Sequence, residues 1–87
     1  MSNIPSSPGA YRLFKDNVVI YVGSAKNLLE RYFDWANNPD NPHVKQRGWD
    51  TFAWQTTSTH NEARRLELKW YYHFQPVCNM VAPPGAA

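Results

Sequence analysis

Three polar side chains stand at ten-residue intervals and have chemistry suited to phosphate: Tyr11, Tyr21 and Arg31. An arginine presents a planar, permanently charged fork to phosphate, and phenol hydroxyls can orient or activate a water molecule. The stretch from residue 9 to residue 31 contains two short β-type runs, a polar turn and the beginning of a helix. Strand side chains alternate between faces and helix side chains repeat about every 3.6 residues, so a hairpin followed by a helix can bring the three groups together. We therefore predict that this stretch forms one wall of a site that cleaves phosphodiester bonds.

A second part of the site is predicted downstream, at Glu67. Phosphodiester hydrolysis needs an activated water, neutralisation of charge on the phosphate oxygens and help for the leaving oxygen. The Glu67 carboxylate is a hard oxygen donor that suits a single Mg²⁺ or Mn²⁺ ion, with water and phosphate completing the shell. The sequence offers no acidic cluster of the kind that a two-metal site needs. The simpler interpretation of Glu67 is an exposed helix charge that pairs with Arg64 or Lys69.

The other three residues also have simpler interpretations. Arg31 could be a helix-surface charge beside Glu30 or Asp34, and both tyrosines could be ordinary strand residues with their hydroxyls at the rim. A phenol with a pKa of about 10 is a poor base at neutral pH. Tyr11 would therefore need a nearby cation and the metal to lower that pKa, and Tyr21 would assist by hydrogen bonding.

The two β-type runs predict a hairpin. A first strand is expected over residues 10–14, with Gly9 just before it, and residues 15–17 have the composition of a turn. Residues 18–22 form a continuous β-branched and aromatic run, typical of a strand that is buried on both faces. Gly23 is expected to break this second strand.

Polar residues mark where the helices begin. Asn27 and Glu30 have the spacing of an N-cap and its N3 partner, which predicts a first helix over residues 28–36. Thr59 and Glu62 form a capping box that opens the clearest helix, and Pro76 stops it. The apolar face of the first helix is expected to contain Leu28, Leu29, Tyr32, Phe33 and Trp35. The core-facing stripe of the later helix is expected to contain Ala63, Leu66, Trp70, Tyr71 and Phe74.

Between these helices the sequence predicts a helical turn and a third strand. Asn41 and the proline after it could start a single helical turn that Gly48 ends. Residues 51–57 alternate in polarity, which indicates a strand that points Phe52 and Trp54 inward. Together the elements predict an α/β (α+β) fold with a three-stranded, mainly antiparallel sheet flanked by helices.

Length and composition indicate one small domain. Its 87 residues include four Trp, five Tyr and four Phe, which can remove enough apolar surface from water to form a core. We expect a flexible lead-in over residues 1–8, a domain over 9–80 and a flexible tail over 81–87. The net charge is only +2, so nucleic-acid contact would come from a local patch rather than from the overall field.

Cellular location is predicted from what the sequence contains. A single cysteine, Cys78, excludes an intramolecular disulfide framework and a cysteine-based zinc cluster. The first residues have neither a basic leader nor an apolar core, and no apolar run approaches membrane-spanning length. We therefore expect a cytoplasmic protein without membrane contact.

Several short motifs resemble the GIY-YIG nuclease domain. The run Gly9-Ala10-Tyr11 stands where that family has GIY, and Tyr21-Val22-Gly23 stands where it has YIG. Residues 24–28 are similar to the usual continuation. Arg31 matches the family's catalytic arginine, and Arg65-Leu66-Glu67 resembles its metal-binding glutamate. Residues 75–79 resemble its closing Pro-x-x-Asn. The two tripeptides and the downstream Arg, Glu and Asn extend from Gly9 to Asn79, which is most of the chain.

The resemblance implies roles for individual residues. It implies a catalytic set of Tyr11, Tyr21, Arg31 and Glu67, with Glu67 as ligand of one Mg²⁺ or Mn²⁺ ion. Substrate contacts are expected from Ser24, Lys26, Arg31, Trp35 and Asn79. For Asn79 a structural role is favoured. For Ser24 and Lys26 a position in a solvated loop without substrate contact is an equal alternative. One position departs from the family: Trp35 stands where it often has His or Tyr, and an indole donates a hydrogen bond but cannot accept a proton.

The resemblance also implies an activity. We expect a metal-dependent endonuclease that acts on DNA, single-stranded or branched, with RNA not excluded. Selection by strand or structure is expected rather than by base sequence, because the chain has no separate recognition domain. A partner protein or a homodimer could also supply substrate selectivity. The alternatives are a catalytically weak module that binds nucleic acid or protein on the same fold, and a plain interaction domain.

Overall fold

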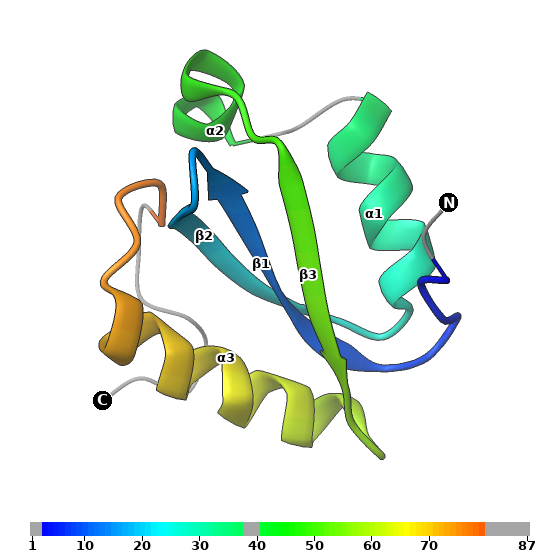
Figure 1. Ribbon diagram of the computed structural model, residues 1–87. Coiled ribbons are helices and arrows are strands. Elements are labelled where there is room, and N and C mark those ends of the chain that lie inside the picture. Colours follow the sequence, from blue (N-terminus) through cyan, green and yellow to red (C-terminus); the bar gives the residue numbers. More distant parts are fainter. Residues whose placement is uncertain (1–2, 38–40, 80–87) are drawn as a thin grey trace.

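The computed structural model describes residues 3–37 and 41–79 and shows a three-stranded sheet with helices on both sides (Figure 1). The elements in chain order are β1 (Gly9–Lys15), β2 (Val18–Ala25), α1 (Leu28–Asn37), α2 (Pro42–Arg47), β3 (Thr51–Thr56) and α3 (His60–Phe74). The strand order is β2-β1-β3, and β1 pairs antiparallel with both neighbours. The predicted fold class is therefore confirmed.

The β1–β2 hairpin turns tightly at Asp16 and Asn17. Both residues have positive φ, 52° and 67°, which matches the right-handed twist of the flanking strands in a two-residue turn. The prediction that Gly23 breaks the second strand is wrong, because β2 continues to Ala25 and Gly23 pairs with Tyr11. The prediction of burial on both faces is also wrong at the start of β2, where Val18 is 60% exposed because it follows the turn.

The two faces of the sheet pack against different helices. Tyr11 and Leu13 lie in the main core with Leu28 and Trp35 of α1 and Phe52 of β3. Side chains on the other face of β1 meet α3, where the Arg12 guanidinium lies 4.7 Å from the centre of the Trp70 ring. Figure 1 shows the sheet between α1 and α3, with α2 near the end where the hairpin turns. The site residues therefore come from elements on opposite faces of the sheet.

The helices begin at the predicted caps. The Asn27 side chain accepts from the N–H of Glu30 at 3.1 Å, and the Thr59 side chain caps α3 by accepting from the N–H of Glu62. Asn41 caps α2 in the same way. The last helix ends at Phe74, and its C-cap Gln75 adopts the left-handed conformation just before Pro76. Helix α1 extends one residue beyond its predicted end, and β3 stops one residue before its own.

The predicted apolar faces are only partly buried. Phe33 of α1 is 53% exposed, since it lies away from the sheet. On α3 the buried residues are Ala63 and Glu67, whereas the rest of the predicted stripe is half-buried. The physical reason is that a polar residue, Glu67, occupies the inward position, where it is hydrogen-bonded to the sheet.

Residues just before β1 pack against the domain. Ile4 is buried, and the carbonyl groups of Ser7 and Pro5 accept from the N–H groups of Leu28 and Leu29. The Pro8 carbonyl accepts from the Thr57 N–H. The division of the chain at residues 8 and 80 stays a prediction, and the predicted tail over 81–87 lies outside the described residues. No helix in the described part of the chain is long and apolar enough to cross a membrane.

Candidate active site

The side chain of Tyr11 lies over a glycine of the neighbouring strand. Tyr11 is 1% exposed and pairs with Gly23 across the β1–β2 ladder. A Cβ atom at Gly23 would stand 2.3 Å from the Tyr11 hydroxyl oxygen, far inside contact distance. The Tyr11 ring therefore occupies space that is free only because Gly23 has no side chain. This role of Gly23 was not predicted from the sequence, although a glycine inside a strand pattern often marks a close approach of another backbone or side chain.

Trp35 stabilises the two tyrosines from α1. Its indole Nε1 donates to the Tyr11 hydroxyl at 3.0 Å, and its ring centre lies 4.9 Å from that of Tyr21. Trp35 is only 7% exposed. The structure thus places this predicted substrate contact within the core, where it holds Tyr11 and Tyr21. The inability of an indole to accept a proton limits Trp35 to donating this hydrogen bond.

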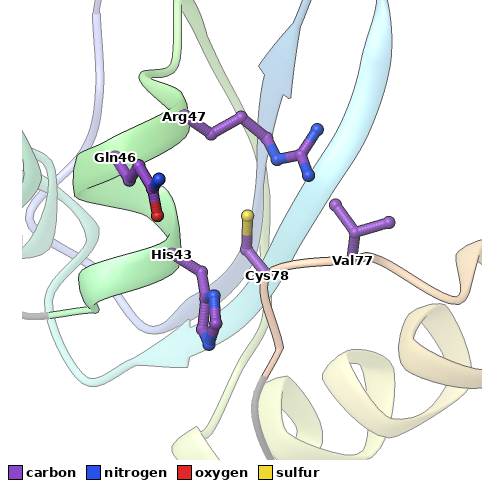
Figure 2. A pocket seen from close by; sticks show the side chains of 5 residues that line it. All are labelled: His43, Gln46, Arg47, Val77 and Cys78. Atoms are coloured by element: carbon purple, nitrogen blue, oxygen red, sulfur yellow. The ribbon is translucent and has the colours of Figure 1, made fainter.

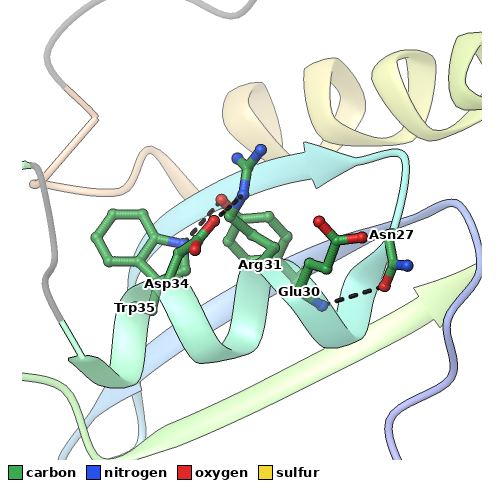
Figure 3. Close-up of polar contacts among 6 residues, drawn as sticks. Asn27, Glu30, Arg31, Asp34 and Trp35 are labelled. Carbon is green, nitrogen blue, oxygen red and sulfur yellow. Dashed lines mark hydrogen bonds and ion pairs between the residues drawn. The ribbon is translucent and has the colours of Figure 1, made fainter.

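Arg31 lies one turn before Trp35 on the same helix (Figure 3). Its Nε is 3.6 Å from Oδ2 of Asp34, in an ion pair whose side chains are 43% and 71% exposed. Such an exposed pair contributes little to stability. The Arg31 guanidinium is near enough to both Tyr11 and Glu67 to influence the pKa of each. Arg31 therefore lies close to both the proposed catalytic tyrosine and the proposed metal ligand.

Glu67 reaches the site from α3. It is 7% exposed, and the Ser24 hydroxyl donates to its Oε1 at 2.6 Å. Burial raises the pKa of Glu67, while the Ser24 hydrogen bond and the charges of Arg64 and Arg31 act in the opposite direction. Ser24, predicted to contact phosphate, thus contacts the predicted metal ligand instead. A buried carboxylate held in this way is unlike the exposed helix charge of the simpler interpretation.

The two tyrosines titrate above their ordinary range. Burial raises the pKa of Tyr11, and the Trp35 hydrogen bond and the Arg31 charge offset only part of that effect. Burial likewise raises the pKa of Tyr21. Arg31 thus lowers the pKa of Tyr11 as the sequence analysis required, but desolvation outweighs it. Both phenols are protonated at neutral pH in this chain, so they can donate and orient but do not act as bases unaided.

Asn79 connects the end of the described chain to β2. Its Oδ1 accepts from the N–H of Val22 at 2.9 Å, and its Nδ2 donates to the Val22 carbonyl at 3.0 Å. The neighbouring Cys78 N–H donates to the Ile20 carbonyl. These bonds continue the edge of the sheet and use the amide of Asn79. Lys26, by contrast, is exposed at the loop before α1.

The donor set around Glu67 suits one hard metal ion. Within residues 3–37 and 41–79 there is no group of three or more His, Cys, Asp or Glu that could hold a metal. Glu67 offers one carboxylate, whose Oε1 accepts a hydrogen bond from Ser24. Mg²⁺ is commonly held by one or two carboxylates while it keeps several waters and binds substrate phosphate. A one-metal site on Glu67 therefore fits the residues that are present.

The fold brings Tyr11, Tyr21, Arg31 and Glu67 close enough together for their charges to affect the pKa values of the two tyrosines. The chain belongs to the UvrC-like GIY-YIG domain family, whose model matches residues 7–80. The resemblance seen in the sequence is therefore confirmed.

Known relatives extend this comparison. UvrABC system protein C of Streptomyces griseus is 41% identical over 83 residues, which cover 88% of this chain and 11% of that protein. The protein of the same name from Acidothermus cellulolyticus is 38% identical, over 88% of this chain and 13% of its own length. The chain thus spans only a small part of the curated relatives it matches.

A solved structure matches the domain itself. The crystal structure of the GIY-YIG N-terminal endonuclease domain of UvrC from Thermotoga maritima is bound to its catalytic divalent cation, magnesium. It superposes with a TM-score of 0.77 at 29% identity and covers 90% of this chain and 89% of that one. The shared fold therefore extends over almost the whole domain.

Proposed function

We propose that this chain is a divalent-metal-dependent endonuclease that hydrolyses phosphodiester bonds in DNA. The observation that carries the proposal is a buried carboxylate, Glu67, that accepts a hydrogen bond from Ser24 and lies near enough to Arg64 and Arg31 for their charges to affect its pKa. A buried carboxylate is costly unless it is paired or binds a metal, so its position beside a cation calls for a functional explanation. The T. maritima domain of the same fold is described as an endonuclease domain with a catalytic magnesium ion.

Each residue of the proposed catalytic set has a distinct role. Arg31 stabilises the negative charge that builds on the phosphate oxygens, because its fork geometry matches phosphate. The Tyr11 hydroxyl, fixed by Trp35, orients the attacking water or the phosphate, and Tyr21 packs beside it. Since both phenols are protonated at neutral pH, their contribution is hydrogen bonding rather than proton removal.

Glu67 is the proposed ligand of a single Mg²⁺ or Mn²⁺ ion. When bound, such an ion neutralises phosphate charge and lowers the pKa of water. The Ser24 hydroxyl fixes the rotation of the carboxylate, which presents Glu67 to the ion in one orientation.

Substrate selection is proposed to follow strand or branch structure rather than base sequence. The residues proposed to contact nucleic acid, Lys26 and Arg31, are of the phosphate-binding type, and phosphate contacts carry no sequence information. Ser24, Trp35 and Asn79 act instead through the internal hydrogen bonds described above. RNA is the substrate with which cleavage of DNA should be compared. Any further selectivity is proposed to come from a partner protein or from a second copy of the chain.

A second candidate function is a binding module with weak catalysis. It is favoured by one observation: the Tyr11 hydroxyl is buried and already bonded to Trp35, while burial raises its pKa. In this case the same surface would bind DNA without cutting it.

Cleavage assays separate the two candidates. We expect the purified chain to cut single-stranded, duplex or branched DNA with Mg²⁺ or Mn²⁺ but not with EDTA. Glu67→Gln keeps the size of the side chain and should lower the cleavage rate about 100-fold or more, because charge stabilisation through the metal is lost.

Glu62→Gln is the matched control, since glutamine also serves in a capping box and should cut normally. Calorimetric titration with Mn²⁺ should show a binding site in wild type that Glu67→Gln lacks. If neither cleavage nor Mn²⁺ binding responds to Glu67→Gln, the metal-dependent nuclease is excluded.

A further inference from the structure

We propose that a cleft beside Arg31 binds a second phosphate of the same DNA strand, adjacent to the phosphate that is cut, and that Lys26 and His60 contact it. The inference rests on the proposed function for the nature of the ligand. It assigns a role to His60, the first residue of α3.

The cleft is lined by residues from the beginnings of α1 and α3. It has a volume of about 400 Å³ and is lined by Lys26, Asn27, Glu30, Arg31, Asp34 and His60. Lys26 comes from the loop before α1, and His60 is the first residue of α3. Because Arg31 belongs both to this cleft and to the candidate active site, a strand held at one continues directly into the other.

Cationic side chains surround His60. Besides its partial burial, the charges of Arg64, Lys26 and Arg31 hold the pKa of His60 below its ordinary value. The charges that act on the pKa of His60 are thus cationic, although Glu30 and Asp34 also line the cleft. A neutral imidazole among three cations can donate a hydrogen bond to a phosphate oxygen while the cations supply the charge.

Asp34, one of the two acidic residues that line the cleft, does not prevent phosphate binding. Asp34 is 71% exposed, and among the described residues it forms an ion pair with Arg31 at 3.6 Å. An exposed pair of this kind is worth little, so a phosphate can replace the carboxylate on Arg31. Asp34 is therefore a competitor of the phosphate, and removing its charge should tighten binding.

A second hollow provides matched controls. Figure 2 shows His43, Gln46, Arg47, Val77 and Cys78 around a space between α2 and the segment after α3. It too contains a histidine and an arginine, but Arg31 and Glu67 do not line it. His43 of this hollow, and Lys45 on the same helix α2, match the two proposed contact residues in type.

The test is DNA binding in the presence of EDTA, measured by fluorescence anisotropy with a labelled single-stranded oligonucleotide and the full chain. We expect His60→Ala and Lys26→Ala each to weaken binding about 3- to 10-fold, and Lys26→Ala to reduce the log–log salt slope by about one. Asp34→Asn should tighten binding by a similar factor. His43→Ala and Lys45→Ala should bind like wild type.

The inference is overturned if His60→Ala binds no more weakly than His43→Ala, or if Asp34→Asn weakens binding. His60→Gln retains a hydrogen-bond donor and should bind DNA more tightly than His60→Ala. Circular dichroism tests whether each variant is folded. Because EDTA removes the metal, the outcome is independent of cleavage. If DNA binding responds to the substitutions as expected but the chain never cuts DNA, the proposed nuclease function is refuted and the phosphate-binding cleft is retained. If the chain cuts DNA normally but none of the substitutions changes binding, the cleft is refuted and the nuclease function is retained.

Discussion

Glu67 and Ser24 show how the chain keeps a carboxylate nearly buried. Removing a charged group from water is costly unless hydrogen bonds or opposite charges replace the lost solvation. The 2.6 Å hydrogen bond from Ser24 and the nearby charges of Arg31 and Arg64 supply that replacement. Ser24 also restricts how the carboxylate rotates. A residue chosen from the sequence as a phosphate contact is therefore better understood as one that positions the metal ligand.

Replacing Ser24 tests this positioning role. Ser24→Ala removes the hydrogen bond and leaves Glu67 free to rotate, so we expect Mn²⁺ affinity to fall about 10-fold. Isothermal titration calorimetry with Mn²⁺ measures the change directly. Ser58→Ala is the control, because Ser58 is exposed in the loop before α3. Equal Mn²⁺ affinities for the two variants would rule out the positioning role.

At the scale of elements, the pairing of β1 with β2 places the Tyr11 ring over Gly23. Gly23 is not among the residues with positive φ, so the strand does not need a glycine for its backbone conformation. It needs one for space, since a Cβ would meet both the hydroxyl oxygen and the ring of Tyr11. The register of two strands thereby determines where a proposed catalytic hydroxyl lies.

Gly23→Ala should therefore displace Tyr11. We expect a loss of about 1–3 kcal/mol in the free energy of unfolding, because overpacking forces neighbouring groups to move. Urea denaturation measures the stability, and near-ultraviolet circular dichroism reports the displaced aromatic cluster.

Gly48→Ala is the informative comparison. Gly48 has φ 78°, so this change strains the backbone, but no atom of the described residues lies within 4 Å of the added Cβ. It should lower stability without altering the aromatic signal or DNA cleavage. A Gly23→Ala variant with unchanged aromatic signal would show that the Tyr11 position does not depend on Gly23.

For the whole molecule, polar contacts between distant residues join elements that local signals cannot connect. Asp50, just before β3, accepts from the Asp16 N–H in the hairpin turn at 3.0 Å, across 34 positions of sequence. The Thr51 hydroxyl donates to the same carboxylate. Asn79 and Val22 are joined across 57 positions. These contacts hold the end of the hairpin and the last described residue on the sheet.

The Asp50 contact predicts a pH-dependent contribution to stability. Hydrogen bonds from the Asp16 N–H and the Thr51 hydroxyl hold the pKa of Asp50 below its ordinary value of 3.8. A carboxyl with a lowered folded-state pKa stabilises the fold above its unfolded pKa, and this contribution is lost as the pH falls through the folded pKa. Wild type should thus be more stable than Asp50→Ala at neutral pH, and the difference should close in acid.

Urea denaturation across a pH series measures this difference. Asp50→Asn keeps an acceptor oxygen but cannot ionise, so the gap between Asp50→Asn and Asp50→Ala should stay constant with pH. A gap between wild type and Asp50→Ala that does not narrow on acidification would contradict the assignment.

Much of the fold is determined by residues near one another in sequence. The caps at Asn27 and Thr59 and the turn before Val18 appear where the sequence predicts them, because each depends on hydrogen bonds and backbone conformations within a few residues. The motif spacing also identified the family, because Tyr11 and the other motif residues are read directly from the chain. Local sequence was not enough to predict the role of Gly23, because a glycine can mark either the end of a strand or a close approach of another residue within it.

Only the tertiary structure decided the chemical state of the site. It buried Tyr11 against Trp35, raised the pKa of the phenol, and turned Ser24 toward Glu67 from 43 positions away. Desolvation depends on every atom packed around a group, and hydrogen-bond partners depend on which strands and helices meet. Neither is a property of local sequence, so the residues of the site could be named from the sequence, but their protonation and their contacts could not.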